Sequence, residues 1–192
     1  MQKQLTCILL AAMLVLGCAP MAKVESNIRP GYNKKIESIY VVSSTGNAGS
    51  PEFTRALLTS LNAKFDAVAI KSKAHVRNPL SLTEAEDMKN EMDAFHPGTV
   101  MYLIQTSRSV SSGGSGSFGG AVFEIALHER GEEVPFWKAI VETQAPNASW
   151  SHGGVMGGGF GAGTKVGDPK LTADRIFEKL QADGLVGVSV AK

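Results

Sequence analysis

The sequence predicts a single α/β (or α+β) domain with a mixed sheet of about five strands. Segments whose apolar residues follow a helical period alternate with short β-branched segments. Two strand-like segments late in the chain also flank a charged glycine turn, as in a β-hairpin. The resulting order is β-α-β-α-β-β-β-α, in which two helices connect strands as crossovers. We therefore expect one domain over residues 35–187, with a core of its own.

The first strand and helix of this domain follow a segment without a regular period. Residues 18–34 contain two prolines and several polar residues, so we expect a flexible tether there. A β-branched run predicts the first strand over 36–43. The first helix begins at Pro51, behind the capping residue Ser50. Its apolar stripe recurs every four residues and consists of Phe53, Leu57, Leu61 and Phe65.

The middle of the chain predicts a second strand, a second helix and a third strand. A short apolar run places the second strand at 67–70. Ser81 and Glu84 have the spacing of a capping box, which predicts a helix start. The third strand spans 100–104 and is apolar nearly throughout, as expected near the middle of a covered sheet. The buried face of the second helix should contain Leu82, Ala85, Met88, Met92 and Phe95.

The last three elements are a hairpin and a helix. Residues 121–128 and 136–143 read as the two hairpin strands, joined by the charged turn 129–133. A helix over 170–183 ends at Gly184, a typical stop residue. In the first hairpin strand, one face carries Ala121, Phe123, Ile125 and Leu127.

The N-terminus predicts a removed export signal. Lys3 precedes a nearly uninterrupted apolar run over residues 5–17. About 13 helical residues reach roughly 20 Å, which is too short to span a hydrocarbon layer of about 30 Å. The segment therefore fits a secretory signal peptide over residues 1–17 better than a transmembrane helix.

The end of this signal reads Val15, Leu16, Gly17, Cys18, which resembles the lipobox of bacterial lipoproteins. The resemblance implies cleavage between Gly17 and Cys18, a diacylglycerol thioether on the Cys18 sulfur and a further acyl chain, such as palmitate, on the freed amine. Two or more acyl chains give lasting membrane attachment. The alternative is an ordinary signal peptide with an accidental cysteine. Cys7 leaves with the signal, so Cys18 has no partner for a disulfide in the mature chain.

Location and charge narrow the classes of function. Ala19 stands where inner-membrane lipoproteins usually carry aspartate, which favours the outer membrane, facing the periplasm; the inner membrane and the cell surface are the alternatives.

Removal of residues 1–17 takes one lysine from the 19 basic residues, and the 18 acidic residues balance the rest. No basic cluster stands out, which argues against nucleic-acid binding. The partners expected are the membrane, through Cys18, and an envelope protein; homo-oligomerisation stays open.

The domain also resembles small mixed α/β envelope lipoproteins. This similarity rests on the lipobox, the order of elements and a hairpin strand that starts with Phe136, Trp137 and Lys138 after an acidic glycine turn. Comparable modules are the globular part of the curli-secretion lipoprotein and the TolB N-terminal domain. The resemblance implies partner binding or assembly, without a catalytic motif.

Two glycine-rich segments, 107–120 and 151–168, are expected to be loops. The first precedes one hairpin strand and the second follows the other, so antiparallel pairing places both at the same end of the sheet. One hypothesis makes them a partner-binding edge, with glycine backbone for hydrogen bonds and aromatic anchors. The other makes them flexible insertions. The candidate partner-binding residues are Arg108, Phe118, Trp150, His152, Met156 and Phe160.

No motif predicts a cofactor, a metal or a catalytic residue. Gly114, Gly116 and Gly119 match the dinucleotide fingerprint, but a strand instead of a helix is expected to follow. The four histidines lack the spacing of paired metal ligands. The function expected is therefore a non-enzymatic, lipid-anchored periplasmic module that binds protein or helps envelope assembly. The alternative is a small periplasmic hydrolase that uses His152 or His128.

Overall fold

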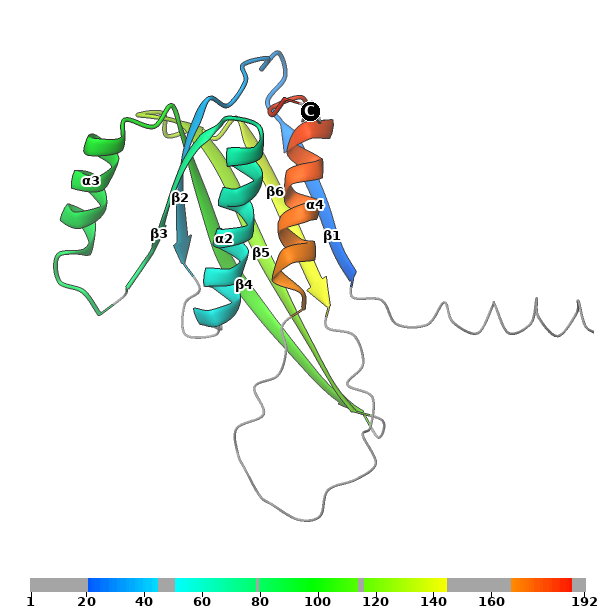
Figure 1. Cartoon of the computed structure of the whole chain (residues 1–192). Helices are drawn as coiled ribbons and strands as arrows, with labels where there is room; N and C mark the ends of the chain where they lie inside the picture. The colour runs from blue at the N-terminus through cyan, green and yellow to red at the C-terminus, as the bar shows by residue number, and fades with distance from the viewer. Residues whose placement is uncertain (1–20, 45–50, 79, 114–115, 145–166, 188–192) are drawn as a thin grey trace, which may run out of the picture.

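The computed structural model describes residues 21–44, 51–78, 80–113, 116–144 and 167–187. They form one α/β domain with a six-stranded mixed sheet and three helices (Figure 1). The fold class is as predicted, with one strand more than expected. The elements are β1 (Met21–Ile28), β2 (Ser38–Ser44), α2 (Pro51–Ala67), β3 (Lys71–Val76), α3 (Glu84–Phe95), β4 (Thr99–Gly113), β5 (Gly116–Glu129), β6 (Trp137–Gln144) and α4 (Pro169–Ala182).

The sheet combines parallel and antiparallel pairs in the order β1-β6-β5-β4-β2-β3. β2 lies parallel to both β3 and β4, as the two helical crossovers require. β4, β5, β6 and β1 then pair antiparallel. The predicted hairpin is therefore confirmed, and its strands β5 and β6 lie inside the sheet.

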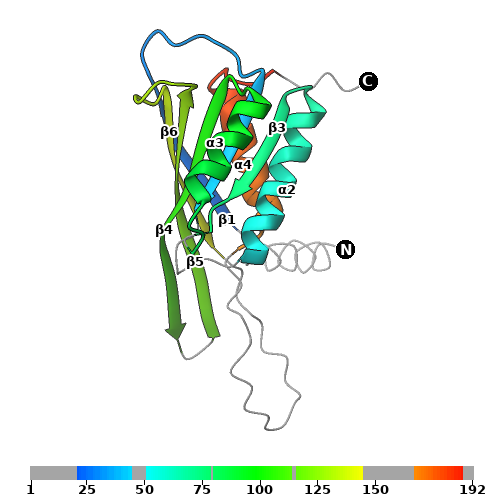
Figure 2. The ribbon, with the colours of Figure 1, turned by 90° about the vertical axis from the view of Figure 1, so that its left-hand side faces the viewer.

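The main core lies between the sheet and the helices α2 and α4, which lie side by side on one face (Figures 1 and 2). The predicted stripe of α2 is buried, and Phe65 meets Phe177 of α4 edge-to-face with 5.8 Å between ring centroids. The predicted inner face of β5 is buried as well. Asp168 caps α4 by accepting hydrogen bonds from the backbone amides of Lys170 and Leu171.

The third helix, α3, lies on the opposite face of the sheet and is only partly buried. Met88, Met92 and Phe95 pack there against a small cluster that contains Tyr40 and Val42 of β2. Two members of the predicted buried face are wrong, because Ala85 is exposed and Leu82 precedes the helix and is fully exposed. The predicted capping box is also wrong. Thr83 is the N-cap and makes no side-chain cap bond, and Glu84 instead contacts His75.

The sixth strand corrects the prediction of a flexible tether over residues 18–34. Residues 21–28 form β1, which pairs with the whole of β6, from Met21 opposite Gln144 to Ile28 opposite Trp137. Val24 and Ile28 face the main core, while Glu25 and Asn27 between them face away. This alternation is short and mixed with charged residues, as is typical of an edge strand, so composition alone suggested a linker.

The second strand lies later in the chain than predicted. Residues 67–70 complete α2 and the turn after it, where Ala69 has a φ of 59° and the Ile70 amide donates to the Phe65 carbonyl. The strand itself is β3, Lys71–Val76, at the far edge of the sheet. Lys71 and Lys73 alternate along this strand, as is typical of an edge strand. A prediction based on apolar runs therefore does not find it.

Residues 107–113 and 116–120 are strand and not the predicted loop. β4 and β5 continue pairing from Arg108 opposite Ala121 to Gly113 opposite Gly116, after an irregularity between Gln105 and Ser107. Serine and glycine do not favour strands, but they pair here because the backbone ladder of the inner sheet extends outward. The result is a two-stranded ribbon that extends beyond the ends of β2 and β6 (Figures 1 and 2).

The signal peptide 1–17, Cys18 and most of the second glycine-rich segment, 151–166, lie outside the described residues. Gly167, next to that segment, has a φ of 99° and leads into α4. Among the described residues, none of the helices combines the length and apolar character needed to cross a bilayer.

Candidate functional site: an open groove on the sheet

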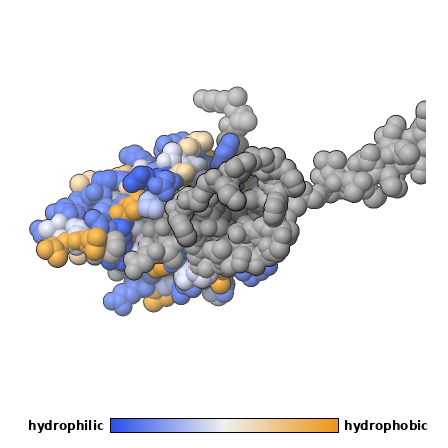
Figure 3. All heavy atoms as spheres, turned by 90° about the horizontal axis from the view of Figure 1, so that it is seen from below, coloured by the Kyte–Doolittle hydropathy of each residue, from blue (hydrophilic) through white to orange (hydrophobic). Residues whose placement is uncertain are grey.

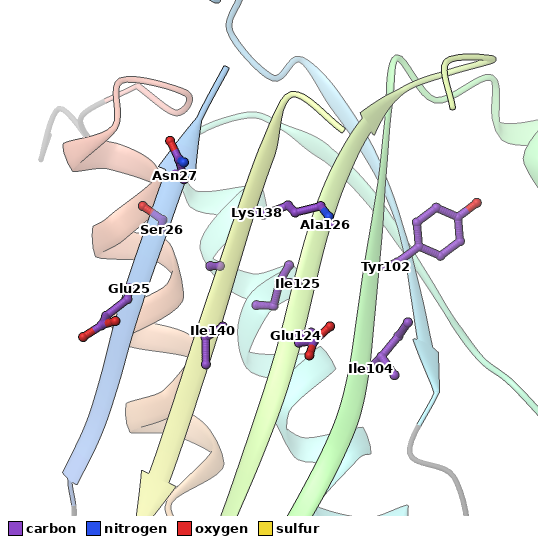
Figure 4. A pocket seen from close by; sticks show the side chains of 11 residues that line it. Glu25, Ser26, Asn27, Tyr102, Ile104, Glu124, Ile125, Ala126, Lys138 and Ile140 are labelled. Carbon is purple, nitrogen blue, oxygen red and sulfur yellow. The ribbon is translucent and has the colours of Figure 1, made fainter. Parts of the chain in front are cut away.

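The sheet face opposite α2 and α4 is covered by α3 only over its β2 side. The remaining strands, β4, β5, β6 and β1, form a shallow groove of about 360 Å³ on this face (Figure 4). Its floor is made by side chains that alternate with the core residues of the same strands. The groove is therefore a direct consequence of strand alternation in a sheet that has one incompletely covered face.

One row of residues crosses the centre of this groove. Ile140 of β6 and Ile104 of β4 lie on either side of Glu124 of β5, each directly opposite it in the strand register. Glu25 of β1 extends the row beyond Ile140. The two isoleucines are 47% and 45% exposed, so an aliphatic surface is open to solvent on both sides of a carboxylate. The next row contains Asn27, Lys138, Ala126 and Tyr102.

The charges in the groove are unevenly paired. Glu25 forms an exposed ion pair with Lys23 on its own strand, and the hydrogen bond from Lys23 lowers the pKa of the Glu25 carboxyl. Glu124 and Lys138 form no ion pair or hydrogen bond with another side chain in the described part of the chain. The Glu124 carboxylate is thus available to a cation presented from outside.

The structure places the predicted residue His128 at one end of this face. Its ring packs edge-to-face on Tyr102 with 5.4 Å between centroids, and its Nδ1 lies 3.2 Å from the Glu132 carbonyl oxygen. Glu124 shares its strand and face, but four residues of strand separate the two by about 13 Å. His128 and Glu124 therefore do not form a hydrogen-bonded pair.

The six candidate partner-binding residues of the glycine-rich segments are only partly placed. The backbones of Arg108 and Phe118 lie in the ribbon of β4 and β5, opposite Ala121 and Ser111 respectively. The other four lie outside the described residues: Trp150, His152, Met156 and Phe160.

A polar cluster that sequence reasoning missed fixes α3 to the sheet. His75 of β3 contacts Glu84 (Nε2 to Oε1, 2.8 Å) and Glu91 (Nδ1 to Oε2, 3.5 Å). Tyr40 donates its hydroxyl to Glu91 over 2.8 Å, and the Lys73 ammonium lies 3.4 Å from the same oxygen. The Tyr40 hydrogen bond lowers the pKa of Glu91, whereas burial raises the pKa of the Tyr40 phenol. The cluster compensates for the small apolar contact of α3.

A second missed feature is the carboxylate of Asp183, just after α4. Its Oδ2 accepts hydrogen bonds from Trp137 Nε1 of β6 over 2.7 Å and from Ser26 Oγ of β1. Its Oδ1 lies 3.0 Å from the Lys179 ammonium. One side chain thus connects the last helix to the edge strand that begins three residues after Cys18. No short motif marks such a node, because its members lie 157 residues apart.

Neither a protein-family model nor a curated protein matches the sequence. Among solved structures, the fold is similar to the PelC dodecamer from Paraburkholderia phytofirmans, with 12% identity, a TM-score of 0.49 and coverage of 88% of this chain and 100% of that chain. Lipoprotein GNA1162 from Neisseria meningitidis has 12% sequence identity and a TM-score of 0.45, with coverage of 76% of this chain and 98% of that chain. A minor lipoprotein from Acinetobacter baumannii has 8% sequence identity and a TM-score of 0.39, with coverage of 80% of this chain and 98% of that chain. These similarities concern the outline of the fold, and no role passes from those proteins to this chain.

Proposed function

We propose that the protein is a lipid-anchored envelope lipoprotein that acts without catalysis, by binding a partner protein on the open groove of its sheet. The lipobox at Val15–Cys18 supports the anchor. In the proposed topology, Cys18 carries the lipid, and Ala19 directs the protein to the periplasmic face of the outer membrane. The domain then stands close to the bilayer, because β1 begins only three residues after Cys18.

The observation that carries the binding function is the row Ile140, Glu124, Ile104. Sheet faces that remain in water usually carry polar side chains, whereas this face exposes two isoleucines, one on either side of the same carboxylate. Ile104 and Ile140 flank the unpaired Glu124 carboxylate, and the unpaired Lys138 ammonium lies in the next row. The central row therefore fits a partner segment with aliphatic side chains and one basic side chain that meets Glu124. The occupant we propose is therefore a basic, aliphatic segment of another envelope protein.

The ribbon of β4 and β5 supplies a second contact in this proposal. It continues the same two strands that carry Ile104 and Glu124, so the groove and the ribbon form one extended surface. Both long edges of the ribbon extend past the neighbouring strands β2 and β6, and within the described residues no other strand pairs with them. In this proposal their backbone groups accept an added strand of the partner. The candidates Arg108 and Phe118, together with Trp150, His152, Met156 and Phe160, belong to this part of the proposal.

Photo-crosslinking in intact cells tests the groove. A photoreactive amino acid replaces Ile104 or Ile140 in the full-length protein, and Glu178 on the outer face of α4 serves as the control position. We expect an adduct of one defined mass from both groove positions and none from the control. The charge reversal Glu124→Lys should abolish the adduct, while the matched reversal Glu178→Lys should leave it unchanged.

Two results would oppose this proposal. If the adduct persists in Glu124→Lys, the partner does not recognise the Glu124 charge, and a basic partner segment is ruled out. An adduct whose mass equals two copies of this chain replaces the proposed partner with self-association. Circular dichroism of the variants shows whether the domain is folded, so that a lost adduct reports on binding.

A further inference from the structure

The two faces of the sheet are covered unequally. On the core face, α2 and α4 lie side by side, and α4 packs over β6 and β1 (Figures 1 and 2). On the opposite face, α3 packs over β2 and β4, where Met88, Met92 and Phe95 contact the small cluster around Tyr40. None of the described helices packs on the other half of this face, formed by β5, β6 and β1. The groove lies in this open half (Figure 4).

The open half has the width of one α-helix. Neighbouring strands lie about 4.8 Å apart, so the three spacings from β4 to β1 span roughly 14 Å. An α-helix with its side chains is about 10–12 Å across. One helix therefore fills the space between the region under α3 and the free edge of β1. In this space it runs along the strands, as α4 does on the core face (Figure 1).

The backbone of the groove floor favours a helix over an extended segment. β5 pairs with β4 and β6 on its two sides, and β6 pairs with β5 and β1. The backbone groups of both strands are thus used within the sheet, and their side chains alone face an occupant. An extended segment on this face finds no strand edge to pair with, whereas a helix forms its backbone hydrogen bonds internally.

Two charges in the groove define the polar contacts of the occupant. Glu124 of β5 and Lys138 of β6 have no ion pair within the described residues. Lys138 lies two residues from Ile140, which is directly opposite Glu124. The two charges are therefore about 7 Å apart along the strands. Because a helix rises about 1.5 Å per residue, a basic and an acidic residue about four positions apart on one helix face can pair with both.

We infer that the occupant of the groove is an amphipathic α-helix of the partner protein. Its aliphatic side chains pack on Ile104 and Ile140, a basic side chain pairs with Glu124, and an acidic side chain pairs with Lys138. This inference rests on the proposed binding function and specifies the conformation and charges of the partner segment. The outer face of the helix is polar, like the surrounding surface, which is mainly hydrophilic in the view from the ribbon end (Figure 3). With the helix bound, two helices cover each face of the sheet.

The spacing of crosslinks on the partner tests the helical conformation. A photoreactive amino acid replaces Val122 or Ala126 of the full-length protein in intact cells, and mass spectrometry identifies the partner residue attached at each position. Both positions lie on the groove face of β5, on either side of Glu124 and about 13 Å apart along the strand. A helix covers that distance in about nine residues and an extended segment in about four. We expect the two crosslinked partner residues to be about nine positions apart.

A charge reversal at Lys138 tests the acidic contact. In Lys138→Glu, the yield of the adduct from a photoreactive residue at position 104 should fall about tenfold, because two acidic groups then face each other. The matched control is Lys170→Glu at the start of α4, on the other face of the sheet, which should leave the yield unchanged. An unchanged yield in Lys138→Glu would overturn the acidic contact.

The other outcomes separate this inference from the function on which it rests. Crosslinked partner residues about four positions apart would show an extended segment, so the helix would be wrong while binding in the groove stands. An adduct from only one of positions 122 and 126 would show that the occupant does not run along β5, which also overturns the helix. If no groove position gives an adduct while circular dichroism shows a folded domain, the proposed function itself is wrong and the inference falls with it.

Discussion

The indole of Trp137 donates a hydrogen bond from Nε1 to the Asp183 carboxylate over 2.7 Å. The Trp137 side chain is buried, and the same carboxylate oxygen also accepts from Ser26. β6, β1 and the end of α4 therefore meet at one charged group. This node fixes the edge strand that connects the domain to the proposed lipid anchor.

Loss of the Asp183 carboxylate should destabilise the whole domain. Asp183→Ala leaves the buried indole N–H without its acceptor, and hydrogen bonds to charged groups contribute roughly 1.5–3 kcal/mol each. We expect a fall in the free energy of unfolding of that order, measured by urea denaturation. Glu178→Ala is the control, because its exposed pair with Arg175 should contribute less than about 1 kcal/mol. Equal effects of both changes would contradict the role of the node.

The Asp183 carboxylate should also contribute to the pH dependence of the domain's free energy of unfolding. Burial raises the pKa of Asp183, but the hydrogen bonds from Ser26, Trp137 and Lys179 outweigh it and hold the pKa below the ordinary 3.8. A carboxyl whose pKa is lowered by folding stabilises the fold above its unfolded pKa, and this stability is lost as the pH falls through the folded value. We expect unfolding free energy to drop below about pH 4, and less steeply in Asp183→Asn. Identical profiles for the two proteins would count against this assignment.

The attachment of α3 should depend on the Tyr40 hydroxyl. Tyr40→Phe keeps the buried ring but removes the hydrogen bond to Glu91, at a cost of about 1–2 kcal/mol. Because α3 has little apolar contact, we expect its amides to exchange with solvent deuterium faster in this variant. The amides of α4 should keep their exchange rates. Uniform acceleration in both helices would show that α3 does not open separately.

Two glycines with positive φ should differ in their tolerance of alanine. Gly131 has a φ of 85°, and a Cβ there meets no atom within 4 Å, so Gly131→Ala should cost about 1–2 kcal/mol from the backbone alone. Gly167 has a φ of 99°, and a Cβ there lies 3.0 Å from Thr143 Cβ. Gly167→Ala should therefore lower the melting temperature more than Gly131→Ala. The reverse order would contradict the close approach of Gly167 to β6.

Periodicity predicted the elements that bury one continuous apolar face. The sequence pattern correctly predicted the stripe of α2, the inner face of β5 and the end of α4 at Gly184. Each of these features depends only on the spacing of neighbouring residues along the chain. The two edge strands were not predicted at their positions. β1 and β3 are short and polar, so their residue types do not indicate a strand, and only pairing with β6 and β2 makes them strands.

The candidate site was the least readable part. The row Ile140, Glu124, Ile104 exists only because three strands align in one register, and the sequence contains no local signal for that alignment. Alternation along the strand places Glu124 on the face opposite Phe123 and Ile125, but it does not show which side chains of the neighbouring strands lie beside it. The glycine-rich composition of 107–120 suggested a loop because propensity cannot show that neighbouring strands extend their ladder through it.

The lipid on Cys18 is the central claim, since the location of the protein, the orientation of its domain and the partner it meets all depend on it. Intact-mass spectrometry of the protein purified from the membranes of a double-membraned bacterium tests it directly. We predict a chain that starts at Cys18 and carries the mass of a diacylglyceryl group and an N-linked acyl chain, with Cys18→Ser as the unmodified control. A mature chain with a free Cys18 thiol, or one that begins at another residue, would contradict the account.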